Sequence, residues 1–434
     1  MKILWLSKLA DGLDMAYRCQ QEGAKVKVCI LDPEEKHLYD GILNSKVDNW
    51  QKELSWCDFV VFDVNSMEKE KKIVFDKGVP AFGMGHSRKS KEAWKISETL
   101  ESDRKMVHDL MNALNMGEKH ETLEFTTIEE AITHLKKHQV PHVIKPESKM
   151  LVESSLTLIG EFDNNEDTIA YLDSFKLRPE ANKISGFAME ERLPGIEVAV
   201  SAWCNGKDFV YPVNINFEHK RFATGDIGFE TGETGTLMYY SDWKIPLFQE
   251  TLYKMGNILM DYDYRGQIDV NCIVNENGIY PLELTPRFGY PAMFIEQELH
   301  KIPWSEFLGN LAYGYSTPLD VYPAWAIGVV CLGEGFPSDK EGKKRMMYIP
   351  IIGVEESNEE HVHLCEAMKI DGKLVCSGMY PLVATAKGKT ITDSQKAVYD
   401  DVIPQIYFPK QFYRTDIGDR VQRDYNTLKK WGIL

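Results

Sequence analysis

The sequence predicts a mixed α/β (α+β) protein built from more than one compact unit. Its first hundred residues alternate apolar runs with amphipathic stretches, which is the pattern of a parallel sheet with crossover helices. Further along, RGQIDVNCIVNENGIYPLEL at 265–284 predicts an antiparallel hairpin whose turn, NENG, ends in glycine. With 434 residues, the chain is long enough for two to four units around a sizeable core.

Composition and charge narrow the class of protein. The apolar content of 43% and the charged content of 27% are typical of a soluble globular chain. A formal net charge of −16 argues against a general binder of nucleic acid or anionic membranes, because Lys and Arg supply that affinity. The eight cysteines include no C-x-x-C pair, which favours reduced thiols in the core. The sequence has no run of 18 apolar residues and only a short apolar start, so we expect a cytoplasmic protein.

The N-terminal unit is expected to span residues 1–100. Apolar runs predict strands at 2–6, 25–31, 58–64 and 79–85, with a helix at 11–23 between the first two. A dinucleotide-binding fold would carry G-x-G-x-x-G after its first strand, so that phosphate could approach the backbone. The chain has SKLADG at that place, which disfavours a dinucleotide site in this unit.

A larger middle unit is expected at 101–322 and a smaller α/β unit at 323–434. Ser102 and Asp103 predict the start of a helix, because such residues cap helix N-termini. The pattern that follows predicts strands at 123–127, 142–146, 157–162 and 186–205, and helices at 128–139 and 246–262. The last unit combines strand-like runs with a helix at 392–401.

Four polar motifs follow one another along the middle unit. They are Lys145 in VIKP, EERLPGIE at 190–197, HKRFATGDIGFETGETG at 219–235, and LELTPRFG at 282–289. In the last motif Glu283, Thr285 and Arg287 alternate, so they share one face at the end of a strand. In order and spacing these motifs resemble those of the ATP-grasp ligases, most specifically the phosphoribosylamine–glycine ligase family. The resemblance covers nearly the whole chain and extends to YRTDIGDR at 413–420.

This resemblance implies an ATP-grasp fold. Residues 1–100 would form a Rossmann-like pre-ATP-grasp domain, 101–322 the ATP-grasp domain with a lid at about 118–188, and 323–434 a small C-terminal α/β domain. The implied cofactors are ATP and magnesium or manganese. The implied partners are small molecules, an amino-acid carboxylate and an amine, with no nucleic acid and no membrane. A monomer or a homodimer is expected.

The resemblance also implies residues that bind the nucleotide. Lys145 would contact the ATP phosphates as a point cation. Glu190 and Glu191 would lie at the interdomain hinge and hold the adenine edge, chiefly through their backbone groups. Glu197 would bind ribose or orient the site. A solvated turn is the alternative for these acids, and it is about as plausible as the hinge for Glu190.

For the metal and the chemistry, the resemblance implies a second set of residues. Glu283 would ligate the metal, with Asp269 as a second carboxylate, since hard cations take carboxylate oxygens. Thr285 stands where the family has a metal-binding Asn. Arg287 would hold the transferring phosphoryl group, where a bidentate guanidinium is useful. Lys220 and Asp226 join it as expected catalytic residues, since the family uses their loop around the amino acid and the phosphorylated intermediate.

The chain departs from the family mainly on the side of the acceptor amine. The family's loop G-x-G-G-R-E-H-A, which receives phosphoribosylamine, is replaced by SKLADGLDMA at 7–16. The glycines that let a phosphate lie against backbone N–H groups are therefore missing. On the nucleotide side, His108 stands where the family has Lys, and Lys105 or Arg104 could compensate. The lid segment PESKMLVESSL at 146–156 has no glycine.

The leading hypothesis is an ATP-dependent carboxylate–amine ligase. An amino-acid carboxylate such as glycine would attack the γ-phosphate, and an amine that can differ from phosphoribosylamine would displace phosphate from the acyl-phosphate. The alternatives are phosphoribosylamine–glycine ligase itself, with a divergent N-terminal loop, and a catalytically inactive ATP-grasp protein that binds a nucleotide or partner. Separately, His361 and His363 alternate along a strand-like run, where a solvated strand edge is favoured over a metal site.

Overall fold

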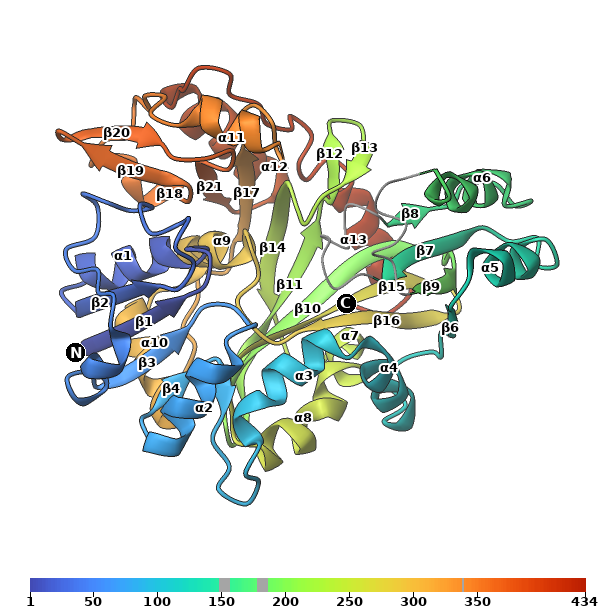
Figure 1. Ribbon diagram of the computed structural model, residues 1–434, viewed down its shortest axis with the longest axis horizontal. Helices are drawn as coiled ribbons and strands as arrows, with labels where there is room; N and C mark the ends of the chain where they lie inside the picture. Colours follow the sequence, from blue (N-terminus) through green and yellow to red (C-terminus); the bar gives the residue numbers. More distant parts are fainter. Residues whose placement is uncertain (148–156, 178–185, 338) are drawn as a thin grey trace.

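The computed structural model describes residues 1–147, 157–177, 186–337 and 339–434, and its N-terminal part is a four-stranded parallel sheet (Figure 1). The strand order is β2-β1-β3-β4. Its elements are β1 (Lys2–Ser7), α1 (Leu13–Gln21), β2 (Lys25–Ile30), β3 (Phe59–Phe62), α2 (Glu68–Lys77) and β4 (Ala81–Phe82). All four strands lie within a few residues of their predicted positions, because each is a short apolar run bounded by polar residues or glycine.

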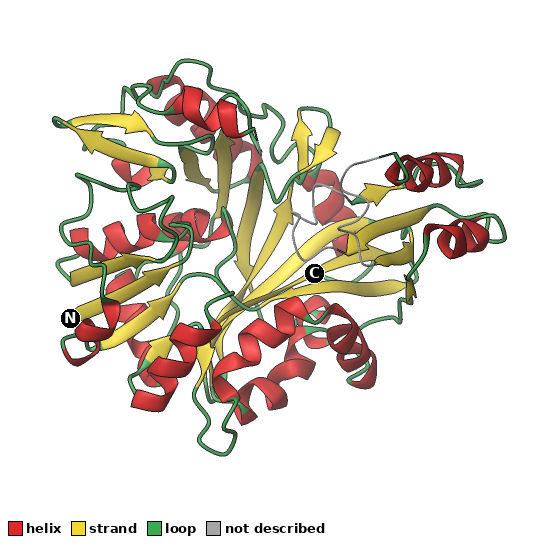
Figure 2. Cartoon of the chain, viewed as in Figure 1, coloured by secondary structure: helices red, strands yellow, loops and turns green. Residues whose placement is uncertain are grey.

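A nine-stranded sheet forms the centre of the molecule (Figure 2). Its path is β16-β15-β10-β11-β14-β17-β21-β18, and β5 pairs with β15 at the edge. The strands are β5 (Met84–Gly85), β10 (Ile196–Asn205), β11 (Phe209–Glu218), β14 (Gly235–Ser241), β15 (Tyr264–Asn275), β16 (Gly278–Thr285), β17 (Trp325–Cys331), β18 (Val362–Leu364) and β21 (Leu382–Gly388). Because β17 pairs with β14, the sheet runs without a break from the middle of the chain into its C-terminal part.

A separate antiparallel sheet, in the order β6-β9-β7-β8, extends at the right of Figure 1. It contains β6 (Thr122–Phe125), α5 (Ile128–Leu135), β7 (His142–Glu147), β8 (Leu158–Ile159), α6 (Glu166–Phe175) and β9 (Gly186–Glu191). It has its own small hydrophobic core, which includes Leu135, Phe175 and Met189. The glycine-free segment predicted at 146–156 lies mostly outside the described residues.

The remaining helices pack around these sheets. They are α3 (Ile96–Ser102), α4 (Arg104–Ala113), α7 (Pro246–Gln249), α8 (Leu252–Asp261), α9 (Ala292–Leu299), α10 (Trp304–Tyr313), α11 (Lys340–Met346), α12 (Ile391–Lys396) and α13 (Val421–Lys430). Two hairpins complete the chain, β12 (Arg221–Ala223) with β13 (Ile227–Glu230), and β19 (Ala367–Ile370) with β20 (Lys373–Cys376). Among the described residues, no helix has the length and apolarity needed to cross a bilayer.

Two helix predictions illustrate what local sequence determines. Asp103 caps α4 as predicted, because its Oδ1 accepts a hydrogen bond from the backbone N–H of Met106 at 3.0 Å. The single helix predicted at 246–262 is wrong, since the chain forms α7 and α8 with a break at Thr251. The Thr251 hydroxyl donates to the carbonyl of Leu247 four residues earlier, a back-bond that often bends helices.

A buried aromatic cluster joins the N-terminal sheet to the end of β16. Phe288 packs between Trp5 of β1, at 6.2 Å between ring centroids, and Phe82 of β4, at 4.8 Å. The Tyr264 hydroxyl donates to the carbonyl of Pro286 at 2.9 Å. These contacts fix the chain on both sides of Arg287, so the guanidinium is held at the junction of the two sheets.

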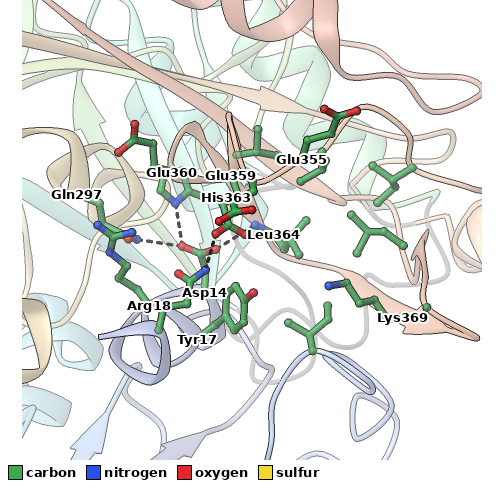
Figure 3. A pocket seen from close by; sticks show the side chains of 18 residues that line it. Asp14, Tyr17, Arg18, Gln297, Glu355, Glu359, Glu360, His363, Leu364 and Lys369 are labelled. Atoms are coloured by element: carbon green, nitrogen blue, oxygen red, sulfur yellow. Dashed lines mark hydrogen bonds and ion pairs between the residues drawn. The ribbon is translucent and has the colours of Figure 1, made fainter. Parts of the chain in front are cut away.

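A second junction joins α1 to the C-terminal part of the chain. Asp14 Oδ2 lies 2.8 Å from His363 Nδ1, and Asp14 Oδ1 accepts the backbone N–H of Leu364 at 3.1 Å (Figure 3). A pocket of about 310 Å³ opens beside this pair, and none of the predicted site residues lines it. His361 Nδ1 is 2.5 Å from Glu298 Oε1. The expectation of a solvated strand edge is therefore wrong, because both imidazoles are paired with carboxylates and His363 is buried.

The central sheet also buries a carboxyl beneath α9, which predicts a pH-dependent stability. Burial raises the pKa of Glu296 to about 8, and hydrogen bonds from Tyr240 and Gln267 offset only part of that rise. The folded state therefore binds the proton more tightly than the unfolded chain, and stability falls as pH rises from about 4.5 to about 8. We expect Glu296→Gln to melt several degrees above the parent at pH 8 and to lose that advantage near pH 5.

Melting curves of both proteins across this pH range provide the measurement. Glu306→Gln, at an exposed position on α10, is the matched control and should show no pH-dependent difference from the parent. An equal melting temperature for Glu296→Gln and the parent at pH 8 would contradict the assignment.

Candidate active site

A lysine surrounded by three carboxylates forms the centre of the site. Lys220 Nζ lies 2.7 Å from Glu197 Oε1, 3.4 Å from Glu218 Oε2 and 3.7 Å from Glu283 Oε1. The three acids come from β10, the end of β11 and β16, which the sheet brings to one side. Burial disfavours the charged form of Lys220, but the three carboxylates outweigh it and hold its pKa well above the usual range.

Glu283 faces the open side of this cluster. Its side chain is 56% exposed, and the charge of Lys220 is the main reason why its pKa lies below the ordinary value. It is therefore an ionised carboxylate that solvent or a ligand can reach. This is the state that a metal-binding carboxylate requires.

Asp269 and Thr285 lie on the same face of the β15–β16 hairpin as Glu283. Asp269 pairs with Thr285 and Asn271 pairs with Glu283 in the antiparallel register, so these four side chains point the same way. Asn216 donates to Asp269 Oδ2 at 3.0 Å, whereas the buried Oδ1 has no hydrogen-bond partner. Burial, and then the charge of Glu218, hold the pKa of Asp269 well above its usual range.

This donor set fits a hard divalent cation. It consists of carboxylate, amide and hydroxyl oxygens, and the unpartnered Asp269 Oδ1 is an oxygen that a cation would satisfy. Within the described ranges, no three His, Cys, Asp or Glu side chains form a ready-made metal cluster. A cation that takes its remaining ligands from phosphate and water, as Mg²⁺ commonly does, is compatible with such an open arrangement.

A second polar cluster lies where the antiparallel sheet β6-β9-β7-β8 approaches β16. Lys145 Nζ donates to Glu190 Oε2 at 2.9 Å, and Thr122 Oγ1 donates to Glu190 Oε1 at 3.0 Å. Burial alone would raise the pKa of Glu190, but Lys145 holds it below the ordinary value. Glu190 is 6% exposed, so the solvated-turn alternative is wrong for this residue.

Two histidines complete this second cluster. His120 Nε2 lies 3.9 Å from Glu190 Oε2, and the His108 ring is bonded to the carbonyl of Leu282. Burial lowers the pKa of both histidines. Lys145 is thus the cation of the cluster at neutral pH, and His108 is a neutral hydrogen-bonding group rather than a substitute for a lysine.

Other predicted nucleotide-site residues lie apart from these clusters. Lys105 Nζ is 3.5 Å from Glu124 on β6, and both side chains are largely exposed. The charge of Arg104, one residue earlier, lowers the pKa of both Glu283 and His108. Glu191 is exposed at the end of β9. Of the two basic residues considered beside His108, Arg104 is therefore the one that the structure brings to the site.

Arg287 lies between the nine-stranded sheet and the N-terminal sheet. Its Nε donates to Glu101 Oε1 at 2.9 Å, and its Nη1 donates to the carbonyl of Phe288 at 2.8 Å. The positive charge of Arg287 lowers the pKa of Glu283 on one side. On the other side it is the main charge that lowers the pKa of Asp11. These two hydrogen bonds fix the orientation of the guanidinium. It lies between the region predicted to bind the nucleotide and the region predicted to bind the acceptor amine.

Asp226 occupies the turn of the β12–β13 hairpin in the left-handed region, with φ of 58°. Its Oδ1 accepts from Arg414 Nη1 at 2.9 Å, and Arg414 also pairs with Asp416. The Gly225 N–H donates to Asp416 Oδ2 at 2.8 Å. In this structure Asp226 ties its loop to the C-terminal segment, which orients the loop that carries Lys220.

Several site residues were missed by the sequence analysis. Glu218 directly precedes the His219-Lys220 pair, and its acidic type beside a predicted catalytic lysine was a usable signal. Glu233 is a carboxyl with an unpartnered buried Oε1, and burial followed by the charge of Glu218 raises its pKa well above the usual range. Glu101 holds Arg287 from a distant helix, and nothing in the local sequence indicates that contact.

Comparison with known proteins identifies the family to which the chain belongs. Residues 102–293 match the family model "Phosphoribosylglycinamide synthetase, ATP-grasp (A) domain", and residues 326–420 match "Phosphoribosylglycinamide synthetase, C domain". The chain belongs to the ATP-grasp ligases. The phosphoribosylamine–glycine ligase of Clostridium acetobutylicum is 26% identical over 353 residues, which is 79% of this ligase and 79% of the relative.

Solved structures show the same fold. The phosphoribosylamine–glycine ligase of Thermotoga maritima superimposes with a TM-score of 0.70 at 20% identity, covering 96% of this ligase and 100% of that chain. The biotin carboxylase domain of Hydrogenobacter thermophilus 2-oxoglutarate carboxylase, in complex with MgADP, ADP and bicarbonate, gives 0.61 at 10% identity. It covers 99% of this ligase and 95% of that chain.

The Lys220 cluster predicts a specific stability effect. Lys220→Met leaves Glu197, Glu218 and Glu283 without their shared cation, which should cost about 3 kcal/mol and lower the melting temperature by several degrees. Magnesium at millimolar concentration should restore part of that loss, because it replaces the missing positive charge.

Lys207→Met is the control for differential scanning fluorimetry. Lys207 follows β10 at the far end of the same strand pair, and its ammonium donates to the carbonyl of Gly314 at 2.9 Å. A smaller effect is expected there, with no magnesium dependence. If Lys220→Met melted like the parent without magnesium, the cluster would not have the proposed electrostatic role.

Proposed function

We propose that this ATP-grasp ligase forms an amide bond between an amino-acid carboxylate and an amine through an acyl-phosphate. The observation that carries the proposal is the placement of Arg287 between two groups of charged residues. On one side lie Glu283 and Lys220, and on the other lies the N-terminal sheet with Asp11. A phosphoryl group held by Arg287 would thus be next to both the metal face and a second substrate.

ATP and magnesium are the proposed cofactors. Glu283 and Asp269 would hold the metal, with Thr285 within the same face, and the bound metal would neutralise charge on the transferring phosphoryl group. Lys145 would exchange Glu190 for a phosphate oxygen, because its ammonium is the cation of the lid cluster. The complex of a structural neighbour with MgADP supports this choice of cofactors.

The chain's own residues would then act mainly by positioning and by charge. Glu101 and the Phe288 carbonyl hold the Arg287 guanidinium, which costs little reorganisation when a phosphoryl group arrives. Lys220, whose loop is tied down through Asp226 and Arg414, would attract the substrate carboxylate. Glycine is the proposed carboxylate substrate, since the curated relatives are named phosphoribosylamine–glycine ligase.

A second candidate is phosphoribosylamine–glycine ligase activity itself. It is favoured by the two matching family domains and by the relative that is similar over 79% of the chain. The segment Ser7–Ala16, which has acids in place of the family's glycine-rich loop, is the observation against it. A purine-requiring bacterial strain that lacks this enzyme should stay auxotrophic when it expresses soluble protein, and growth without purines would establish the second candidate instead.

Hydroxylamine trapping tests the leading proposal without knowledge of the natural amine. Hydroxylamine is small and largely uncharged at neutral pH, so it should intercept an acyl-phosphate. Incubation with ATP, magnesium, glycine and hydroxylamine should yield glycine hydroxamate and ADP in equal amounts. Failure to form a hydroxamate with glycine or with any other common amino acid would contradict the proposal.

The variant Glu283→Gln sharpens this test. Loss of the exposed carboxylate should raise the magnesium concentration needed for half-maximal hydroxamate formation by about 10- to 100-fold. Glu276→Gln, in the exposed turn of the same hairpin, should leave that concentration unchanged. An unaltered magnesium requirement in Glu283→Gln would remove this residue from the metal site.

A further inference from the structure

The N-terminal sheet has an acidic region at the place where such sheets bind ligands. In the order β2-β1-β3-β4, the chain leaves β1 toward β2 on one side and places β3 on the other (Figure 1). Ligands of open parallel sheets bind outside the carboxyl ends of the strands at this point of reversal. Asp11 lies in the segment that follows β1, and Asp63 directly follows β3.

Asp63 is a fully buried carboxyl whose bonding is incomplete. Its Oδ2 accepts hydrogen bonds from Trp5 Nε1 and from the backbone N–H of Gly12, each at 3.1 Å. The Ser7 side chain also forms a hydrogen bond with this carboxyl, and the buried Oδ1 has no other partner. The Tyr290 hydroxyl uses the backbone carbonyl of Asp63, at 3.0 Å, and leaves the carboxyl oxygen free. A buried carboxyl oxygen without a donor is costly, and a ligand that donates to it would remove that cost.

Two more carboxylates surround Asp11. The negative charges of Glu366, from the C-terminal part of the chain, and of Glu35, from the segment after β2, both raise the pKa of Asp11. Lys343 pairs with Glu35 and lies 3.8 Å from Glu366 Oε1, so one ammonium serves two acids. Glu35 Oε2 is a second buried oxygen without a partner.

The charges of this region do not balance. Arg287, the chief cation near Asp11, already pairs with Glu101, and Lys343 is shared by Glu35 and Glu366. Burial raises the pKa of Asp11 to about 6, and burial together with the charge of Asp11 raises that of Asp63 to about 7. Burial is the main cause of both shifts, and neighbouring carboxylates add to them: Glu366 and Glu35 for Asp11, and Asp11 for Asp63. An added positive charge would offset the contribution of these carboxylates.

We infer that this region receives the acceptor as a cationic amine without a phosphate group, with its ammonium between Asp11 and Asp63. The inference rests on the proposed ligase function and names the class of its second substrate. Asp11 and Glu283 both feel the charge of Arg287, so an amine held here lies beside the place where the acyl-phosphate would form. A phosphorylated amine would bring two negative charges toward four carboxylates.

The chemical step balances with these groups. The bound ammonium gives one proton to the Asp11–Asp63 pair and becomes a neutral amine. Its nitrogen attacks the acyl carbon, the new C–N bond forms, and the bond from that carbon to the phosphate oxygen breaks. The second proton leaves the nitrogen with the departing phosphate, so the products are the amide and hydrogen phosphate.

Matched amines test the inference. Ethanolamine and O-phosphoethanolamine differ only by the phosphate, and putrescine carries a second positive charge. With ATP, magnesium and glycine, we expect amide formation with putrescine and ethanolamine, and a kcat/KM for O-phosphoethanolamine that is at least about 100-fold lower. Isothermal titration calorimetry with putrescine measures binding independently of turnover. Ribose 5-phosphate with ammonia supplies the phosphorylated alternative.

Variants inside the acidic region, and one at the opposite end of the N-terminal sheet, locate the effect. Asp11→Asn should raise KM for putrescine and its calorimetric Kd by about 10- to 100-fold. Glu366→Gln provides a second variant on the same region. Asp58→Asn is the control and should change neither value, because Asp58 lies just before β3, at the opposite end of the sheet, and its carboxylate accepts the Lys2 N–H at 2.7 Å.

The outcomes separate the inference from the proposed function. Preference for the phosphorylated amines, or unchanged putrescine binding in both Asp11→Asn and Glu366→Gln, would overturn the inference even if hydroxamate forms. If the parent forms no hydroxamate but binds putrescine in a way that depends on Asp11, the result would contradict the ligase function while supporting a cation site. If the parent forms the hydroxamate and prefers the cationic amine, and Asp11→Asn loses that preference, the result would support both the inference and the ligase function.

Discussion

The ion cluster around Lys220 is the interaction on which the rest of the site depends. Three carboxylates from β10, β11 and β16 would repel one another at these distances, and a single ammonium holds them together. The cluster thereby keeps Glu283 ionised and facing outward, with Asp269 and Thr285 beside it. In the proposed function, a metal ion that enters this face would meet carboxylates that are already assembled, and Lys220 would then be free to attract a substrate anion.

Two chemically different regions flank this cluster. The lid side presents Lys145, with Glu190 and two neutral histidines, which suits the phosphates of a nucleotide. The N-terminal side presents carboxylates at the ends of β1 and β3, which suit an ammonium. The charge of Arg287 influences the pKa of both Glu283 and Asp11, and Phe288, packed between Trp5 and Phe82, fixes the position of Arg287. The aromatic junction thus sets how far apart the two substrates lie.

Much of the fold follows from the sequence because its signals are local. The buried strands of the N-terminal sheet, the cap at Asp103 and the hairpin of β15 and β16 all have short-range patterns. The alternation in LELTPRFG correctly placed Glu283 and Thr285 at the end of a strand. The break at Thr251 was not predicted, because one hydroxyl back-bond is invisible to hydrophobic periodicity.

Long-range pairs were the main limit for the site. Glu101 and Arg287 are 186 residues apart, and His363 and Asp14 are 349 apart, so no local pattern could indicate either contact. Lys145 was expected to contact phosphate and Glu190 to act chiefly through its backbone, and neither expectation indicated that the two side chains pair with each other at 2.9 Å. Side-chain type predicted which residues matter, and topology decided which of them meet.

Transfer of an oxygen label tests the central claim most directly. If the substrate carboxylate attacks the phosphoryl group, one of its oxygens must leave with the phosphate when the amide forms. Glycine labelled with ¹⁸O in its carboxylate, turned over with ATP, magnesium and putrescine, should therefore give one labelled oxygen in the phosphate for each amide formed. Amide formation accompanied by unlabelled phosphate would contradict an acyl-phosphate pathway and the roles assigned to Lys220, Glu283 and Arg287.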